Sequence, residues 1–136
     1  MRWALLLSKS LKILLVEDDQ GQEELLRLML DSLGLTDVTT AANGDNAYSL
    51  IEETADPFDL IISDMHMPGL SGIQLLEKIR DDKRHYATPF ILITADNAVD
   101  LPMHAIDHEV SSFLQKPFLP DRFKEHILNA LAKGEQ

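Results

Sequence analysis

The stretch Asp59-Leu-Ile-Ile-Ser-Asp64-Met-His-Met-Pro68-Gly-Leu-Ser-Gly72 decides the fold of this chain. Its apolar run at 60–62 includes β-branched residues and is typical of a strand buried on both faces of a parallel sheet. Asp64 follows the run, and Pro68 with the next glycine predicts a loop before a helix. A carboxylate at the C-terminal end of a central strand faces the crevice where open α/β sheets bind ligands. A strand-end aspartate also commonly caps its own loop, and this stretch alone leaves both interpretations open.

The rest of the chain alternates short apolar runs with segments of helical spacing. The runs predict five strands, at Ile13–Val16, Val38–Ala41, Leu60–Ile62, Pro89–Thr94 and Ser112–Gln115. The helical spacing predicts five helices, at Gln20–Leu33, Asp45–Thr54, Ser71–Ile79, Asp100–Asp107 and Pro120–Lys133. Such regular alternation predicts a doubly wound α/β domain with a five-stranded parallel sheet and five flanking helices.

The length of 136 residues suits one domain. We predict an N-terminal extension at 1–11, a folded domain at 12–133 and a short tail at 134–136. The apolar run Trp3–Leu7 is shorter than the ~7–15 residues of a signal-peptide core and far too short to span a bilayer. It is interpreted as a loose extension or as the end of a linker from a longer parent chain. No association with a membrane is expected.

The composition narrows the function further. The formal charge of −11 argues against a nucleic-acid surface, because phosphate binding needs clustered basic side chains. Cysteine is absent, which excludes disulfides and cysteine-based metal sites and is compatible with the cytoplasmic location that we expect. Histidines at 85 and 126 are interpreted as ordinary surface residues.

Polar side chains gather at the predicted strand ends. Glu17 and Asp18 follow the first strand, Asp64 follows the third, Thr94 ends the fourth, and Lys116 follows the fifth. Because all carboxyl ends of a parallel sheet lie along one edge, we expect these five side chains to be neighbours in space.

This group of side chains predicts phosphoryl transfer. Three converging carboxylates would repel one another and raise one another's pKa values, and Mg²⁺ relieves that repulsion by binding carboxylate, water and phosphate oxygens. Lys116 adds a positive charge and Thr94 a hydroxyl donor. A carboxylate nucleophile beside a cation, an ammonium group and a hydroxyl suits transfer of a phosphoryl group onto Asp64.

Four segments resemble the signature segments of response-regulator receiver domains, the CheY-like domains of two-component signalling. They are Val16-Glu-Asp-Asp19, Asp64-Met-His-Met-Pro68, Ile93-Thr-Ala-Asp96 and Phe113-Leu-Gln-Lys-Pro-Phe118. The resemblance covers Lys12 to about Lys133. It implies a flavodoxin-like sheet with strand order 2-1-3-4-5.

The resemblance also implies roles for individual residues. Asp64 would accept a phosphoryl group from a phosphohistidine of a sensor kinase or of a histidine phosphotransfer protein. Glu17 and Asp18 would hold Mg²⁺ beside it, and the backbone carbonyl of His66 would be a further metal ligand. The acyl phosphate would later hydrolyse, so the domain would be a timed phosphorelay switch.

The same resemblance implies how the signal leaves the domain. Thr94 and Lys116 would sense the phosphoryl group, and Phe113 would be the aromatic switch residue, at a position where many members carry tyrosine. Together they would repack the face formed by the fourth helix, fifth strand and fifth helix. Output would pass to a downstream protein effector, from a free-standing chain or from one domain of a longer hybrid kinase or regulator. The Lys116–Pro117 bond is expected to be cis, as is usual in the family.

The sequence departs from the family pattern in the segment His108–Ser111, which has no glycine before the fifth strand. His66 and Asp96, each two residues after a site residue, would flank the path of water to the acyl phosphate. We expect them to shield the phosphoryl group. General-base assistance by His66 is the competing interpretation.

Two other classes of protein remain as alternatives. A metal-dependent phosphohydrolase with an aspartyl nucleophile typically has a second acid two residues after the nucleophile, where this chain has His66, and it tends to need a cap domain. A pseudo-receiver that only binds partners would have no need of three clustered acids. We therefore expect a signalling domain that catalyses its own phosphorylation and slow dephosphorylation, and not a multiple-turnover enzyme.

Overall fold

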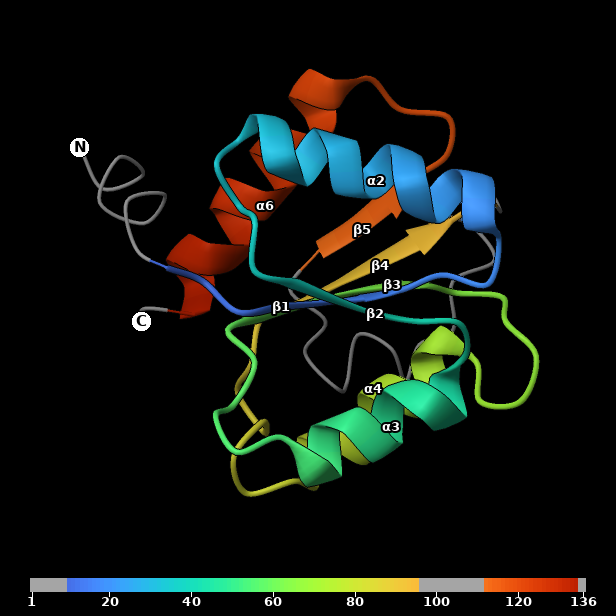
Figure 1. Cartoon of the computed structure of the whole chain (residues 1–136), viewed down its shortest axis with the longest axis vertical. Helices are drawn as coiled ribbons and strands as arrows, with labels where there is room; N and C mark the ends of the chain where they lie inside the picture. The colour runs from blue at the N-terminus through green and yellow to red at the C-terminus, as the bar shows by residue number, and fades with distance from the viewer. Residues whose placement is uncertain (1–9, 96–111, 135–136) are drawn as a thin grey trace.

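The computed structural model describes residues 10–95 and 112–134, which form a parallel sheet between two layers of helices (Figure 1). The strands are β1 (Ile13–Val16), β2 (Val38–Ala41), β3 (Leu60–Asp64), β4 (Phe90–Thr94) and β5 (Ser112–Gln115). The described helices are α2 (Gln20–Ser32), α3 (Gly44–Glu53), α4 (Gly72–Arg80) and α6 (Pro120–Gly134). Neighbouring strands pair in the order β2-β1-β3-β4-β5, and every pairing is parallel.

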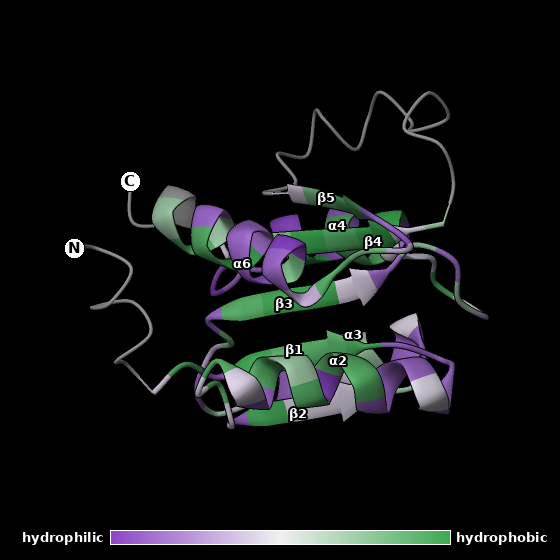
Figure 2. Cartoon of the chain, turned by 90° about the horizontal axis from the view of Figure 1, so that it is seen from above, coloured by the Kyte–Doolittle hydropathy of each residue, from purple (hydrophilic) through white to green (hydrophobic). Residues whose placement is uncertain are grey.

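Two hydrophobic cores lie on the two faces of the sheet. Helices α2 and α6 cover one face, and α3 and α4 cover the other (Figure 1). Successive residues of β1 alternate between the cores: Ile13 and Leu15 pack toward α2 and α6, while Leu14 and Val16 pack toward α3 and α4. Burial of this kind contributes roughly 1.5–3 kcal/mol per large apolar side chain. The inner strands β1, β3 and β4 therefore are mostly apolar runs, and Figure 2 draws most of their length green.

Helices α2, α3 and α4 each begin after a residue whose side chain caps the first turn. Asp19 accepts a hydrogen bond from the backbone N–H of Gln22 at the start of α2 (2.9 Å), and Asn43 caps α3 in the same manner. Ser71 and Gln74 form a capping box at the start of α4. Each cap fixes the residue at which its helix begins, and therefore where the preceding loop ends. These loops follow the strand ends that carry the polar side chains.

The structure confirms the predicted fold class and the strand order. Asp64 is the last residue of β3, whereas the sequence predicted that it would follow the strand. The helix predicted over 100–107 and the segment 108–111 lie outside the described residues. The limits of the N-terminal extension and of the tail stay predictions. In the part of the chain that the structure describes, no helix is long and apolar enough to cross a membrane.

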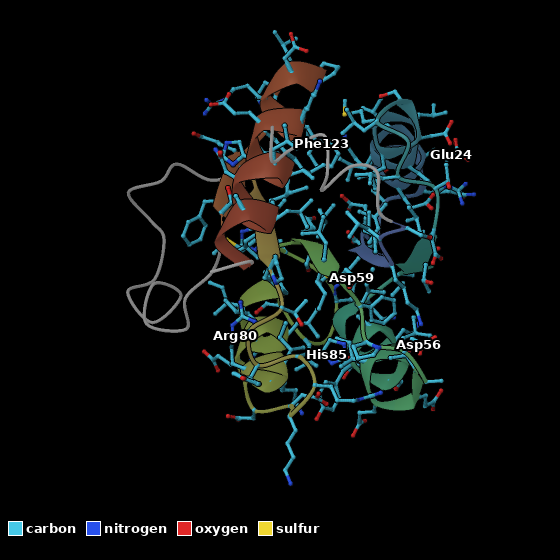
Figure 3. The ribbon with its side chains drawn as sticks, turned by 90° about the vertical axis from the view of Figure 1, so that its left-hand side faces the viewer. Glu24, Asp56, Asp59, Arg80, His85 and Phe123 are labelled. Carbon is cyan, nitrogen blue, oxygen red and sulfur yellow. The ribbon has the colours of Figure 1, made fainter. Side chains whose placement is uncertain are left out.

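The interpretation of His85 as a surface residue was wrong, because its side chain is fully buried. Its Nε2 accepts a hydrogen bond from the backbone N–H of Phe58 (3.1 Å), and its Nδ1 lies 3.1 Å from Asp82 Oδ1. Because a backbone N–H only donates, Nδ1 carries the proton that Asp82 accepts. The ring thus joins the loop after α4 to the loop before β3 (Figure 3). His126 is half-buried and contacts Ser112 Oγ.

Candidate functional site

The parallel register brings three carboxylates together at the carboxyl edge of the sheet. Val16 of β1 lies opposite Ser63 of β3, so the residues that follow, Glu17 and Asp64, are neighbours. The backbone N–H of Glu17 donates to Ala41 of β2 (3.0 Å), which continues the strand pairing one residue beyond β1. One carboxylate oxygen each of Glu17, Asp18 and Asp64 lies within 4.8 Å of the others. The predicted acid cluster is therefore present in the structure.

Lys116 provides the positive charge of the cluster. Its Nζ lies 3.5 Å from Glu17 Oε1 and also 3.5 Å from Asp64 Oδ1. Its backbone N–H donates to the carbonyl of Thr94 (2.8 Å), which places residue 116 beside the end of β4. The bond from Lys116 to Pro117 is cis, as the sequence predicted. One ammonium group therefore faces two carboxylates.

The carboxylates carry unequal electrostatic costs because they are unequally buried. The side chain of Asp18 is exposed, whereas Glu17 and Asp64 are only 4% and 9% exposed. Burial, and next the negative charge of Asp64, raise the pKa of Glu17 to about 7. Burial also raises the pKa of Asp64, while the ammonium of Lys116 opposes that rise. The cluster is therefore short of positive charge.

The donor set fits a hard divalent cation. Among the described residues, Glu17 Oε1 is a buried side-chain oxygen with no hydrogen-bond partner. A buried acceptor without a hydrogen bond is costly even beside the Lys116 ammonium, and a cation bound by oxygen ligands would lower that cost. A groove of about 460 Å³ is lined by Glu17 and Asp18, together with residues such as Gln20 and Thr40.

The other predicted site residues occupy the same end of the sheet or lead to it. Thr94 ends β4, is 2% exposed and lies opposite Gln115 of β5. Phe113 of β5 lies opposite Leu92 and packs, half-buried, against the core beneath α3 and α4. His66 is exposed in the loop after β3. Asp96 lies outside the described residues, so its pairing with His66 stays a prediction.

Sequence reasoning missed the role of Gly72, the first residue of α4. Its N–H donates to the carbonyl of Met65 (2.9 Å) and closes the loop that follows Asp64. A Cβ at this position would lie 2.5 Å from the carbonyl oxygen of Asp64 and 2.6 Å from Leu92 Cδ1. Helix α4 therefore approaches β3 as closely as it does because residue 72 has no side chain. The short spacing from Asp64 to this glycine was the available signal.

The sheet topology and its acidic carboxyl edge define a flavodoxin-like signalling domain. The family model described as "Response regulator receiver domain" matches residues 13–128. The chain therefore belongs to the response-regulator receiver domain family of two-component signalling. Proteins of this class are signalling proteins and not multiple-turnover enzymes in the usual sense. The resemblance inferred from the four signature segments is confirmed.

Individual relatives agree with this assignment. The chain is 32% identical to chemotaxis protein CheY of Pseudomonas aeruginosa over 117 residues, which cover 86% of this chain and 93% of that protein. Among solved structures, CheY4 of Vibrio cholerae has a TM-score of 0.82 at 25% identity and covers 90% of this chain and 100% of its own. The receiver domain of sensor histidine kinase PA1611 from Pseudomonas aeruginosa has a TM-score of 0.76 at 30% identity and covers 88% of this chain and 95% of its own. That structure has a magnesium ion coordinated in the active-site cleft.

Proposed function

We propose that this chain is a phosphorelay switch whose Asp64 accepts a phosphoryl group from a phosphohistidine of a sensor kinase or phosphotransfer protein. One observation carries the proposal. Asp64 ends the central strand β3, and its carboxylate lies within 4.8 Å of two further carboxylates and 3.5 Å from the ammonium of Lys116. That set combines an anionic nucleophile with groups that neutralise a phosphoryl group, which is what this reaction needs from a protein.

The contacts of Asp64 favour one of its oxygens as the nucleophile. Oδ1 accepts a hydrogen bond from the N–H of Met65 (3.0 Å) and lies beside Lys116 Nζ. We therefore assign the attack on phosphorus to Oδ2. A P–O bond forms at Asp64 while the P–N bond of the donor breaks, and its electron pair returns to the donor imidazole. The ammonium of Lys116 then faces the new phosphoryl oxygens and offsets their charge.

Glu17, Asp18 and Asp64, with the backbone carbonyl of His66, would hold Mg²⁺. When bound, Mg²⁺ draws negative charge from the phosphoryl oxygens and lowers the repulsion between donor and carboxylates. The buried Oε1 of Glu17, which has no hydrogen bond, supports this assignment, as does the magnesium ion in the related PA1611 receiver domain. Thr94, which is buried at the end of β4, would donate its hydroxyl to a phosphoryl oxygen.

The signal would leave through β5 and α6. Phosphorylation would draw Thr94 toward the new phosphoryl group, and Phe113 would move into the space vacated at the neighbouring strand. Phe113 is only half-buried in its present position, which leaves room for further burial. The change would repack the face of β5, α6 and the predicted helix at 100–107, and that face would control a downstream protein effector.

The proposal is tested by labelling the purified chain with a small-molecule phosphodonor and Mg²⁺, followed by intact mass. We expect one added phosphoryl group, no labelling of Asp64→Asn, and no labelling after the cation is chelated. Asp59→Asn, which alters a carboxylate at the opposite end of the same strand, is the matched control and should label normally. Labelling of Asp64→Asn equal to wild type would overturn the acceptor assignment. An unlabelled wild type that still binds Mg²⁺ would instead favour a binding module that is not phosphorylated.

A further inference from the structure

The loop between β3 and α4, residues 65–71, is tied down at both ends. At its start, the N–H of Met65 donates to the carbonyl of Ile93 in the neighbouring strand (2.8 Å). At its end, the N–H of Gly72 donates a hydrogen bond to the carbonyl of Met65 (2.9 Å). His66 lies inside this closed loop, so the position of its carbonyl depends on how the remainder of the loop is held.

The first turn of α3 holds the far half of the loop through Asp45. Asp45 Oδ2 accepts a hydrogen bond from the backbone N–H of Leu70 (3.3 Å). The same oxygen lies 2.1 Å from where a Cβ on Gly69 would be, and Gly69 has a left-handed φ of +76°. The carboxylate thus occupies the space that a side chain at residue 69 would need.

A second close approach strengthens the contact between the loop and α3. A Cβ on Gly44 would lie 2.3 Å from the carbonyl oxygen of Leu70. Backbone therefore packs on backbone here, with the Asp45 carboxylate beside it. Two residues without side chains, Gly44 and Gly69, are required for this fit, and they come from segments 25 positions apart.

We propose that Asp45 is a positioning residue of the metal site. It acts through the loop, by holding Gly69 and Leu70 so that the carbonyl of His66 stays directed at the cation. The proposal rests on the proposed function for the role of His66, whereas the contacts of Asp45 are independent of that role. Partners in the outer shell of a metal site typically change metal affinity by about 10- to 100-fold when they are removed. Because this hydrogen bond is long and exposed, we expect the lower end of that range.

The experiment measures Mg²⁺ affinity of the full chain by calorimetry. Asp45→Ala should raise the Kd for Mg²⁺ about tenfold, whereas Asp45→Asn, which keeps an acceptor oxygen, should stay close to wild type. Asp31→Ala, which removes one carboxylate from the exposed side of α2, is the control for net charge and should leave the Kd unchanged. Equal weakening by Asp45→Ala and Asp45→Asn would assign the effect to charge and overturn the positioning role.

A double-variant cycle tests whether Asp45 and Gly69 act as one unit. In Gly69→Ala the new methyl group would push the Asp45 carboxylate aside, so this variant alone should weaken Mg²⁺ binding much as Asp45→Ala does. The double variant should have about the same Kd for Mg²⁺ as Gly69→Ala. If the two substitutions acted independently, their fold-changes in Kd would multiply. A double variant whose fold-change in Kd equals the product of the two single fold-changes would overturn the proposal.

Phosphorylation rates separate the loss of positioning from a general loss of structure. The rate of Asp45→Ala should fall at low Mg²⁺ and return to the wild-type value when the cation is saturating. A rate that stays low at saturating Mg²⁺ would contradict the proposal. If Asp45→Ala keeps the wild-type Kd while the wild type labels on Asp64, the positioning role fails and the proposed function stands. If the wild type neither binds Mg²⁺ nor labels, both fail.

Discussion

The buried carboxyl group of Glu17 should make the stability of the metal-free protein fall as pH rises. Burial and the neighbouring Asp64 raise the pKa of Glu17 from 4.5 to about 7 in the folded state. The folded chain therefore holds this proton more tightly than the unfolded chain does, so the free energy of unfolding falls between pH 4.5 and about 7 and levels off above that. The perturbation that isolates the effect is Glu17→Gln, which has no proton to lose.

The size of the effect follows from the same pKa. One pKa unit corresponds to about 1.4 kcal/mol, so a rise from 4.5 to about 7 costs the folded state about 3 kcal/mol once Glu17 is fully ionised. Between pH 5.5 and pH 8 the wild type should lose roughly 2 kcal/mol of stability that Glu17→Gln does not lose. At pH 8, Mg²⁺ at ten times its Kd should raise the free energy of unfolding by about 1.4 kcal/mol. The stabilisation by Mg²⁺ should be smaller at pH 5.5, where the proton on Glu17 competes with the cation.

The assay is urea unfolding followed by circular dichroism, at pH 5.5 and pH 8, with a chelator or with Mg²⁺. The informative quantity is the pH-dependent change in unfolding free energy of the wild type minus that of Glu17→Gln, because titrating groups remote from Glu17 contribute equally to both. Asp18→Ala should weaken the response to Mg²⁺ and raise the stability of the metal-free protein, since one repelling charge is removed. Parallel pH profiles for wild type and Glu17→Gln would refute the reasoning, and so would a Mg²⁺ response that is the same at both pH values.

Three further predictions concern other parts of the molecule. His66→Ala should shorten the lifetime of the aspartyl phosphate, because an imidazole beside the phosphoryl group blocks water; slower loss across pH 6 to 8 would instead favour general-base assistance. His85→Phe should lower the unfolding free energy by about 1–3 kcal/mol, because the buried N–H of Phe58 loses its acceptor. Its Kd for Mg²⁺ should stay at the wild-type value, since His85 lies at the opposite edge of the sheet, and a large change would contradict that separation. Gly72→Ala should both destabilise the fold and weaken labelling, because its methyl group would collide with the backbone of β3. Urea unfolding and intact mass measure the two effects.

The strands could be predicted from the sequence because helices cover both faces of the sheet. All residues of β1, β3 and β4 are buried, so each strand is a short run without polar interruptions, apart from the positions near the carboxyl edge. The strand order could not be derived from those runs, since nothing in an apolar run says which run is its neighbour. It came from the resemblance to receiver domains.

The acid cluster could be predicted because residues at the carboxyl ends of parallel strands lie along one edge of the sheet, whatever their separation in the sequence. Glu17 and Asp64 are 47 residues apart, yet each follows or ends a strand, and all such ends share one edge. His85 could not be placed in this way. Its burial depends on a hydrogen bond from the backbone of Phe58, 27 residues away, and on a loop whose course no periodicity encodes.

The residues that escape prediction at the site share a physical character. Asp45, Gly69 and Gly72 act on backbone atoms of a loop, and such contacts leave no pattern of hydrophobicity or charge. The acids, by contrast, stand out because they oppose folding: the buried Glu17 and Asp64 raise each other's cost, and a single ammonium offsets it. The proposed metal site accounts for a sequence that keeps such a cost at the end of its central strand, because a bound divalent cation would supply the positive charge that the cluster lacks.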